Sequence, residues 1–295
     1  TPTGDGSQRT SRFLEEAQVT GQLEHPGIIP VHEMGLDASG RLFFTMRLVK
    51  GSTLGEVIHH THKGHEHWTL TRVLGVILKV CEAMAFAHSK RVIHRDLKPA
   101  NIMLGDEGET QVVDWGLARA APGGDGGALA SDARLTAAGA VLGTPAYMSP
   151  EQAFGRKLDW RSDLFSAGSV LYELATGAAP FHAANEIDLI FAVRDANPTP
   201  ARDINPDIPE QLSRIIEKAM SRSRSARYQT ALEFRDALLR FLRNYNPKYR
   251  RTKLSRFMKR VWSEEIERDL RAIEPSEPQK ERVAGLACCA LDFLP

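Results

Sequence analysis

Residues Asp163–Thr176 constrain the fold most, because the helix predicted there is apolar on nearly every side. A helix of that kind must be buried, and Gly177 directly after it is a typical helix stop. Burying this helix requires other helices around it. Three amphipathic segments with helical spacing can supply them, at Thr69–His88, Glu210–Met220 and Ala231–Phe241. We therefore predict a helical body built around residues 163–176.

The front of the chain has a different pattern. Phe13–Leu23 has the apolar spacing of a helix, which the His-Pro-Gly sequence at residues 25–27 ends. Ile28–His32 and Arg41–Val49 have the composition of strands, joined by a turn around residues 37–40. A front section with strands and a helical rear section together predict an α+β fold. Residues 1–11 are polar, and we expect a disordered lead-in there.

Composition and charge exclude several classes of protein. The chain has 295 residues, of which 42% are apolar and 25% charged, and a formal net charge of +1. This is the balance of a globular protein, and it gives no electrostatic reason to expect nucleic acid as a partner. Cys81, Cys288 and Cys289 make no disulfide framework and fit a reducing compartment, so we predict a cytoplasmic location. No run of about 18 apolar residues predicts a membrane span.

The chemistry is concentrated in residues 94–101 (H-R-D-L-K-P-A-N) and 114–116 (D-W-G). Phosphoryl transfer needs a carboxylate that orients the attacking hydroxyl, cations that offset phosphate charge, and oxygen ligands for Mg²⁺. Asp96 is the candidate base and Lys98 the candidate phosphate cation. Asn101 and Asp114 offer the metal ligands. We therefore predict ATP and Mg²⁺ as cosubstrate and cofactor.

These motifs resemble the eukaryotic-type (Hanks-type) serine/threonine protein kinases. Residues 143–151 (G-T-P-A-Y-M-S-P-E) look like that family's substrate-docking segment, and residues 163–168 look like the start of its central helix. The resemblance runs from Phe13 to Phe241, and residues 23–32 look most like bacterial members. It implies a two-lobed fold with a mainly helical large lobe. It also assigns regulatory or structural roles to Glu16, Arg95, Thr136, Thr144, Glu151, Asp163 and Arg227.

Within that resemblance, Asp163 ties the backbone of the catalytic loop in place, and Arg227 pairs with Glu151. Glu16 matches the helix glutamate that pairs with the nucleotide lysine, but the chain has no lysine before Lys50. The resemblance therefore implies a small lobe without its glycine-rich loop and lysine strand, and we expect the chain itself to bind ATP poorly. The remaining nucleotide contacts fall on Met46, Arg47, Val49, Met103, Lys98, Asn101 and Asp114.

Residues between the D-W-G motif and Glu151 make the predicted activation segment. Ala120–Ala140 is rich in glycine and alanine and predicts a mobile loop. Our hypothesis is that phosphorylation of Thr136, with Ser131 as the competing site, orders this loop through Arg95.

A separate cluster of five histidines at residues 59–67 has irregular spacing, and we interpret it as a polar loop rather than a metal site.

The predicted domain order is a lead-in (1–11), a partial small lobe (12–49), a large lobe (50–241), a basic amphipathic helical extension (242–275) and a tail (276–295). Three roles stay open for the apolar stripe within residues 252–273. It packs on the large lobe, it docks a partner protein, or it lies on an anionic membrane surface. Two alternatives to a serine/threonine protein kinase stay open. One is a non-catalytic, kinase-like scaffold, because the small lobe is incomplete. The other is a small-molecule kinase, against which residues 143–151 argue.

Overall fold

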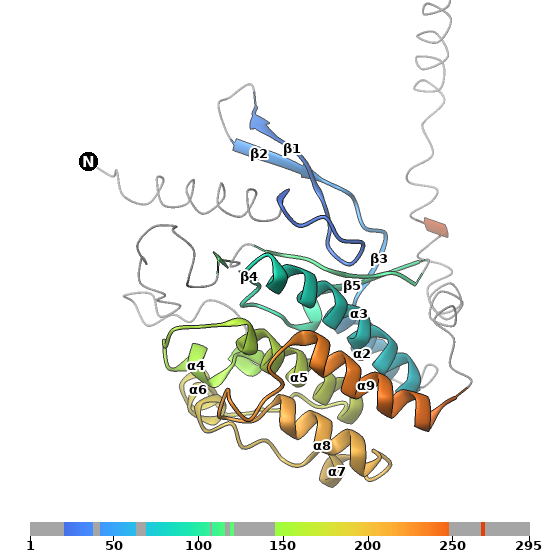
Figure 1. The fold of residues 1–295 in the computed structure, drawn as a ribbon, viewed down its shortest axis with the longest axis vertical. Helices are drawn as coiled ribbons and strands as arrows, with labels where there is room; N and C mark the ends of the chain where they lie inside the picture. Colours follow the sequence, from blue (N-terminus) through green and yellow to red (C-terminus); the bar gives the residue numbers. More distant parts are fainter. Residues whose placement is uncertain are drawn as a thin grey trace, which may run out of the picture.

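A computed structural model describes residues 21–37, 42–62, 69–106, 108–115, 119–120, 145–247 and 267–268, with backbone alone at 42, 60–62 and 119–120. The structure combines an antiparallel strand pair with a larger helical body that carries short strands (Figure 1). Mixed α and β content with a helical rear section was predicted, and the described residues confirm it.

The elements follow one another from the strand pair into the helices. The strands are β1 (Val31–Leu36), β2 (Leu42–Met46), β3 (Gly51–Thr53), β4 (Val92–Ile93), β5 (Ile102–Gly105), β6 (Thr110–Val112) and β7 (Arg119–Ala120). The helices are α2 (Leu54–His62), α3 (Leu70–Ser89), α4 (Pro150–Ala153), α5 (Trp160–Thr176), α6 (Glu186–Asp195), α7 (Ala201–Ile204), α8 (Glu210–Ala219) and α9 (Ala231–Tyr245). Two short 3₁₀ turns are η1 (Pro99–Asn101) and η2 (Pro145–Tyr147).

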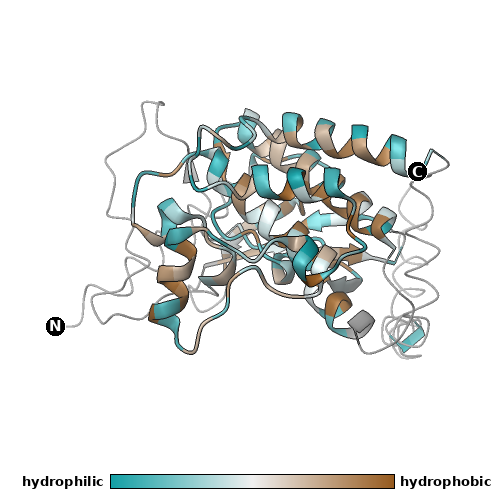
Figure 2. Cartoon of the chain, turned by 90° about the horizontal axis from the view of Figure 1, so that it is seen from below, coloured by the Kyte–Doolittle hydropathy of each residue, from teal (hydrophilic) through white to brown (hydrophobic). Residues whose placement is uncertain are grey.

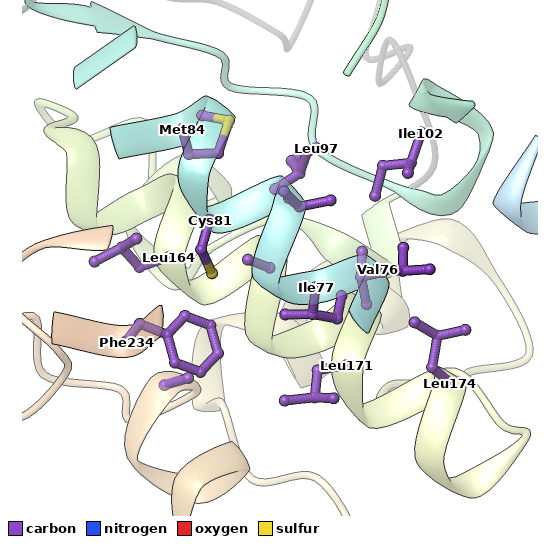
Figure 3. Packing of buried hydrophobic residues seen from close by; sticks show 14 of the residues in the cluster. Val76, Ile77, Cys81, Met84, Leu97, Ile102, Leu164, Leu171, Leu174 and Phe234 are labelled. Carbon is purple, nitrogen blue, oxygen red and sulfur yellow. The ribbon is translucent and has the colours of Figure 1, made fainter. Parts of the chain in front are cut away.

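Helix α5 lies in the core, as its composition predicts. It packs against α3 and α8, and α3 also packs against α9. Figure 3 shows side chains of α3, α5 and α9 meeting in this core, among them Ile77, Leu171 and Phe234. Helices α5 and α8 approach closely at Gly168, where an added Cβ would lie 2.9 Å from the Cβ of Ala219. The helical body therefore depends on the helix that the sequence marks as buried.

The ends of α5 explain one shift from the sequence prediction. The helix begins at Trp160, not at Asp163, because the Asp159 carboxylate accepts a 2.9 Å hydrogen bond from the Arg161 N–H and caps the first turn. Asp163 is thus inside the helix, in its first turn. The helix ends at Gly177 as predicted, and this residue has a φ of 79°, which favours glycine.

The first strand was misplaced by the sequence prediction. Ile28–His32 was expected to be a strand, but β1 covers Val31–Leu36 and pairs antiparallel with β2. Ile28 instead makes a parallel bridge to Val112 of β6, and the Val112 N–H donates to the Gly27 carbonyl at 2.8 Å. This contact ties the segment before the hairpin to the strand that leads into the D-W-G motif.

The strands β3, β5 and β6 form an antiparallel sheet beside α3. Thr53 of β3 pairs with Met103 of β5, and Leu104 pairs with Thr110 of β6. A capping box then starts α2, since the Thr53 N–H and hydroxyl both donate to Glu56 Oε2 at 2.7 and 2.9 Å. The sheet therefore places β3, which follows the predicted hinge segment, beside β5, which follows the catalytic loop.

The peripheral helices are amphipathic, and Figure 2 shows both hydrophilic and hydrophobic residues along them. Helix α8 buries one face with Leu212, Ile215 and Ile216, and α9 buries Phe234 and Leu238. Helix α9 extends to Tyr245, four residues beyond the predicted end at Phe241. Among the described residues, none of the helices has both the length and the apolar composition needed to cross a bilayer.

Candidate active site

The loop between β4 and η1 orients the carboxylate of Asp96. Lys98 Nζ donates to Asp96 Oδ2 at 2.8 Å. Asn101 Nδ2 donates to the Asp96 carbonyl at 2.8 Å and to Asp96 Oδ2 at 3.2 Å. The side chains of Asp96 and Lys98 are 12% and 18% exposed, so this ion pair lies at the edge of solvent. The structure thus brings together three residues for which the sequence predicts catalytic roles.

Side chains from elsewhere in the fold fix the backbone of this loop. Asp163 of α5 accepts from the His94 N–H at 3.0 Å and from the Arg95 N–H at 2.9 Å. The Asp96 N–H donates to His94 Nδ1 at 3.2 Å. Arg95 has a φ of 72°, which is unfavourable for a side chain with a Cβ. These contacts keep the backbone in that strained conformation, as is common at functional sites.

Asp163 is a buried anion with good partners. The residue is 1% exposed, and His88 Nε2 lies 2.8 Å from its Oδ2. Burial by itself raises the pKa of the Asp163 carboxyl, but the His88 hydrogen bond and charge, the His94 ring and the Arg95 N–H outweigh it and hold the pKa below its usual value. Asp163 is therefore ionised near neutral pH and can accept hydrogen bonds from the loop.

The His94 ring joins the catalytic loop to the D-W-G segment. Its Nδ1 accepts from the Asp96 N–H, so its Nε2–H donates to the Val113 carbonyl at 3.1 Å. The Trp115 ring packs edge-on against it, with centroids 4.6 Å apart and planes at 60°. Burial lowers the pKa of His94 from its ordinary 6.5, and the neighbouring carboxylates oppose this only in part. The neutral form is the one that fits both hydrogen bonds.

This burial predicts a pH dependence of stability. His94 has a lowered pKa in the folded state, so its contribution to stability is complete above pH 6.5 and is lost as the pH falls below it. The loss reaches up to about 1.4 kcal/mol for each pH unit. We expect the free energy of unfolding to fall less steeply between pH 7.5 and 5.5 in His94→Gln than in the wild type. Burial also lowers the pKa of His25, and His25 contributes to the pH dependence of stability in both proteins. Equal slopes would contradict the prediction.

The D-W-G segment lies beside the catalytic loop, since the Val113 N–H donates to the Asn101 carbonyl at 2.9 Å. Asp114 is exposed and has a φ of 60°, in the left-handed region. Trp115 is 3% exposed, and its Nε1–H donates to the Val112 carbonyl at 3.2 Å. A buried tryptophan therefore occupies the position where the family motif has phenylalanine. Gly116 lies outside the described residues.

The donor set fits a magnesium ion. The Asn101 amide nitrogen is used by Asp96, which leaves Asn101 Oδ1 without a partner among the residues that the structure describes. Asp114 adds a carboxylate on the adjacent loop. Amide and carboxylate oxygens are hard ligands, and Mg²⁺ in such sites takes its remaining ligands from phosphates and water. The residues predicted as metal ligands are thus chemically suited and placed on neighbouring segments.

The predicted adenine contacts are less enclosed than the polar end. Met46 ends β2 and is 46% exposed, and Arg47 is exposed as well. Val49 and Met103 are partly buried. The pairing of β3 with β5 places Met103 opposite Thr53, soon after the segment that carries Val49. The sequence predicts a hinge and an apolar floor here, and of these residues the structure exposes Met46 and Arg47 and partly buries Val49 and Met103.

At the rear of the site, Arg227 is 1% exposed and Glu151 is 5% exposed. Arg227 Nη1 and Nη2 donate to the two Glu151 carboxylate oxygens at 2.7 and 2.8 Å. The other three donors of the guanidinium go to the carbonyls of Ser221, Arg161 and Arg222. Burial raises the pKa of Glu151, but Arg227 and the Ser162 hydroxyl outweigh it, so the pKa lies below its usual value. This buried pair anchors the end of the predicted docking segment.

Two contacts of the site were not predicted from sequence. His88 reaches Asp163 from the last turn of α3. Gln152 of α4 donates from Nε2 to the Arg95 carbonyl at 2.6 Å. The serine three residues before Gln152 is a capping-box signal that could have drawn attention to it. Several predicted features lie outside the described residues: Glu16, Thr136, Thr144, the predicted helix at 252–273 apart from residues 267–268, and the side chains of His60, His62, His65 and His67.

Comparison with known proteins identifies the family. The profile of the protein kinase domain matches residues 3–238. The chain belongs to the protein kinase family. This confirms the resemblance to Hanks-type kinases that the motifs indicate.

Several similar curated proteins come from bacteria, which agrees with the resemblance of residues 23–32 to bacterial members. A probable serine/threonine-protein kinase of Streptomyces coelicolor is 36% identical over 228 residues, which are 76% of this chain and 32% of that protein. A probable serine/threonine-protein kinase PknB of Bifidobacterium longum is 34% identical over 286 residues, 92% of this chain and 39% of that protein. The serine/threonine-protein kinase PknB of Mycobacterium tuberculosis is 36% identical over 232 residues, 78% of this chain and 35% of that protein. The chain thus spans between 32% and 39% of the length of these relatives.

Proposed function

We propose that the chain is the catalytic part of a serine/threonine protein kinase, which transfers the γ-phosphoryl group of ATP to serine or threonine hydroxyls of proteins. The observation that carries the proposal is the oriented Asp96 carboxylate, held by Lys98 and Asn101 on a backbone that Asp163 fixes. The relatives bear the name of serine/threonine-protein kinases, which supports the same reaction.

Each residue of the site has a distinct task in this proposal. Asp96 orients the acceptor hydroxyl and takes its proton as the bond to phosphorus forms. Lys98 offsets negative charge on the transferred group. Asn101 and Asp114 hold Mg²⁺, which supplies electrostatic stabilisation of the phosphate oxygens when bound. The hydrogen bond from Lys98 to Asp96 supports this, because it holds the carboxylate in one orientation.

The nucleotide, the location and the partners are also proposals. The segment from Met46 to Val49 binds the adenine edge, and Met103 forms the floor beneath it. That the small lobe lacks its first strands stays a prediction, as do a cytoplasmic location and a partner protein at residues 252–273. The free, buried thiol of Cys81 fits a reducing compartment and supports the location.

Two alternatives to a protein kinase can be tested by their products. A kinase-like scaffold would show no phosphoryl transfer, although the relatives give this reading no support. A small-molecule kinase would phosphorylate small hydroxyl compounds and not proteins. The buried anchor of Glu151, at the end of the predicted peptide shelf, favours protein substrates.

In the experiment, the full-length natural protein is incubated with labelled ATP and Mg²⁺. Three acceptors are tested: the protein itself, casein, and a set of small alcohols and amino sugars. Acid hydrolysis of the labelled protein then separates phosphoserine, phosphothreonine and phosphotyrosine. We expect phosphoserine or phosphothreonine on protein. Label confined to small molecules, label on tyrosine alone, or no label on any acceptor would each reject the proposed function.

A further inference from the structure

The side chain of Gln152 connects two segments that are far apart in sequence. Gln152 lies in the first turn of α4. Its Oε1 accepts from the Ser149 N–H and from the Ser149 hydroxyl, both at 3.0 Å. Its Nε2 donates to the carbonyl of Arg95 at 2.6 Å, across 57 positions of sequence. One amide therefore caps a helix with its oxygen and holds the catalytic loop with its nitrogen.

The carbonyl that Gln152 binds belongs to the peptide group just before Asp96. The Arg95 N–H on one side of this group is fixed by Asp163. The Asp96 N–H within it donates to His94. The Gln152 contact supplies the partner on the carbonyl side, so both polar atoms of this peptide group have a side-chain partner. Rotation of the peptide plane would turn the Asp96 side chain, because the two are joined through a single Cα.

The other half of the bridge ends at the predicted docking segment. Ser149 is buried and precedes Pro150 and Glu151, whose carboxylate is anchored by Arg227. The oxygen of Gln152 is thus tied to the end of this segment, next to the buried Glu151–Arg227 pair. A shift of this segment would move the donor away from the Arg95 carbonyl. Arg95, whose φ of 72° is unfavourable for a residue other than glycine, would then lose one of the contacts that hold its backbone.

We propose that Gln152 is a positioning residue for phosphoryl transfer: it couples the docking segment to the orientation of Asp96 through the Arg95 carbonyl. This rests on the proposed function. The residue touches neither nucleotide nor acceptor. It keeps the catalytic carboxylate in the productive geometry only while the docking segment is in place, and small errors in such geometry are costly.

The substitution Gln152→Glu separates the two halves of the bridge. A glutamate in this position still accepts from Ser149, as in the usual Ser-x-x-Glu capping box. It is also favoured in the first turn of a helix. It has no N–H for the Arg95 carbonyl, so two oxygen acceptors face each other. We expect kcat to fall by about tenfold, the effect of one lost internal hydrogen bond. The KM for ATP and the melting temperature should stay close to wild type.

The pH profile supplies a readout that helix capping alone would not change. A protonated glutamic acid can donate to the Arg95 carbonyl as glutamine does. The ratio of kcat for Gln152→Glu to kcat for wild type should therefore rise as the pH falls from 8 toward 5.5. Gln152→Ala loses both halves of the bridge, so it should lower both kcat and the melting temperature, and its ratio to wild type should not change with pH.

A matched control uses the same chemical change at another site. Gln229 donates from Nε2 to the carbonyls of Arg224, Ser225 and Arg227, outside the catalytic loop. Gln229→Glu also removes an amide donor from backbone carbonyls, and it should leave kcat unchanged. All four proteins are compared at full length with Mg²⁺, ATP and casein as acceptor.

The outcomes separate this proposal from the function on which it rests. A wild-type kcat in Gln152→Glu overturns the positioning role alone, as does a fall that is independent of pH and matches Gln152→Ala. A wild-type protein that phosphorylates no protein overturns the proposed function as well. A tenfold fall with recovery at low pH, together with a silent Gln229→Glu, supports the coupling.

Discussion

Replacing Asp96 with asparagine is expected to lower kcat for protein phosphorylation by about 10²–10⁴-fold. The variant keeps the shape of the side chain and one oxygen that can accept from Lys98 or Asn101. It loses the basic oxygen that receives the proton of the acceptor hydroxyl. The loss should therefore appear in the transfer step rather than in folding or in nucleotide binding.

The measurement compares initial rates of label transfer to casein in the full-length wild type and in Asp96→Asn, with the KM for ATP determined in parallel. We expect the KM to change little, because Asp96 acts on the acceptor hydroxyl and its own partners are Lys98 and Asn101. A matched control is Asp207→Asn, the same change of charge on an exposed loop before α8, which should leave kcat unchanged. A variant that retains more than about a tenth of wild-type kcat would rule out Asp96 as the general base, since such bases contribute at least 10²-fold.

The long buried helices could be predicted from local composition. The apolar character of residues 163–176 placed α5 in the core, and the apolar spacing of residues 69–88 gave α3 to within a residue at each end. Where the prediction was shifted, a nearby polar contact decides the boundary. Asp159 caps α5 three residues earlier than expected. A strong capping residue thus overrides the apolar pattern that first marks a helix.

Contacts between distant segments were harder to predict. Ile28 has the composition of a strand, but in the fold its bridge is to Val112, and the hairpin strand starts at Val31. Helix α2 was missed, and the polar loop expected at residues 59–67 is wrong for His59–His62, which end that helix. The short elements α4, α6 and α7 were missed as well, because a single turn or a helix with one buried residue has little apolar period to detect. The pairing partner of a strand depends on the whole fold and not on the sequence of the strand alone.

The same distinction applies to the site. The motif order predicted which residues converge. The structure places Lys98 and Asn101 in direct contact with Asp96, and Asp163 against the backbone just before it. The bridge from Gln152 has no motif that spans its 57 positions, and only the folded chain shows it. Sequence thus indicates the groups that perform chemistry better than the groups that hold them in position.

Replacing Arg227 with alanine is expected to destabilise the fold by about 3–5 kcal/mol, as removal of one partner from a buried ion pair commonly does. The variant leaves the Glu151 carboxylate buried without its cation. It also removes the donors from the carbonyls of Ser221, Arg161 and Arg222. Arg227→Lys should be intermediate, because an ammonium has three donors where the guanidinium uses five. Chemical and thermal unfolding of the three proteins at pH 7 measure these differences.

A double-mutant cycle with Glu151→Gln tests whether the stranded charge causes part of this loss. In Arg227→Ala, burial of Glu151 is no longer outweighed, so the pKa of that carboxyl should rise above its unfolded value. A group with a raised pKa contributes most at low pH and loses its contribution as the pH rises. The deficit of Arg227→Ala relative to wild type should therefore shrink between pH 7 and pH 5. It should also be smaller when Glu151→Gln is already present, by a coupling of about 0.5–3 kcal/mol. Additive effects and a deficit that does not change with pH would show that the carbonyl contacts, and not the buried charge pair, carry the stability.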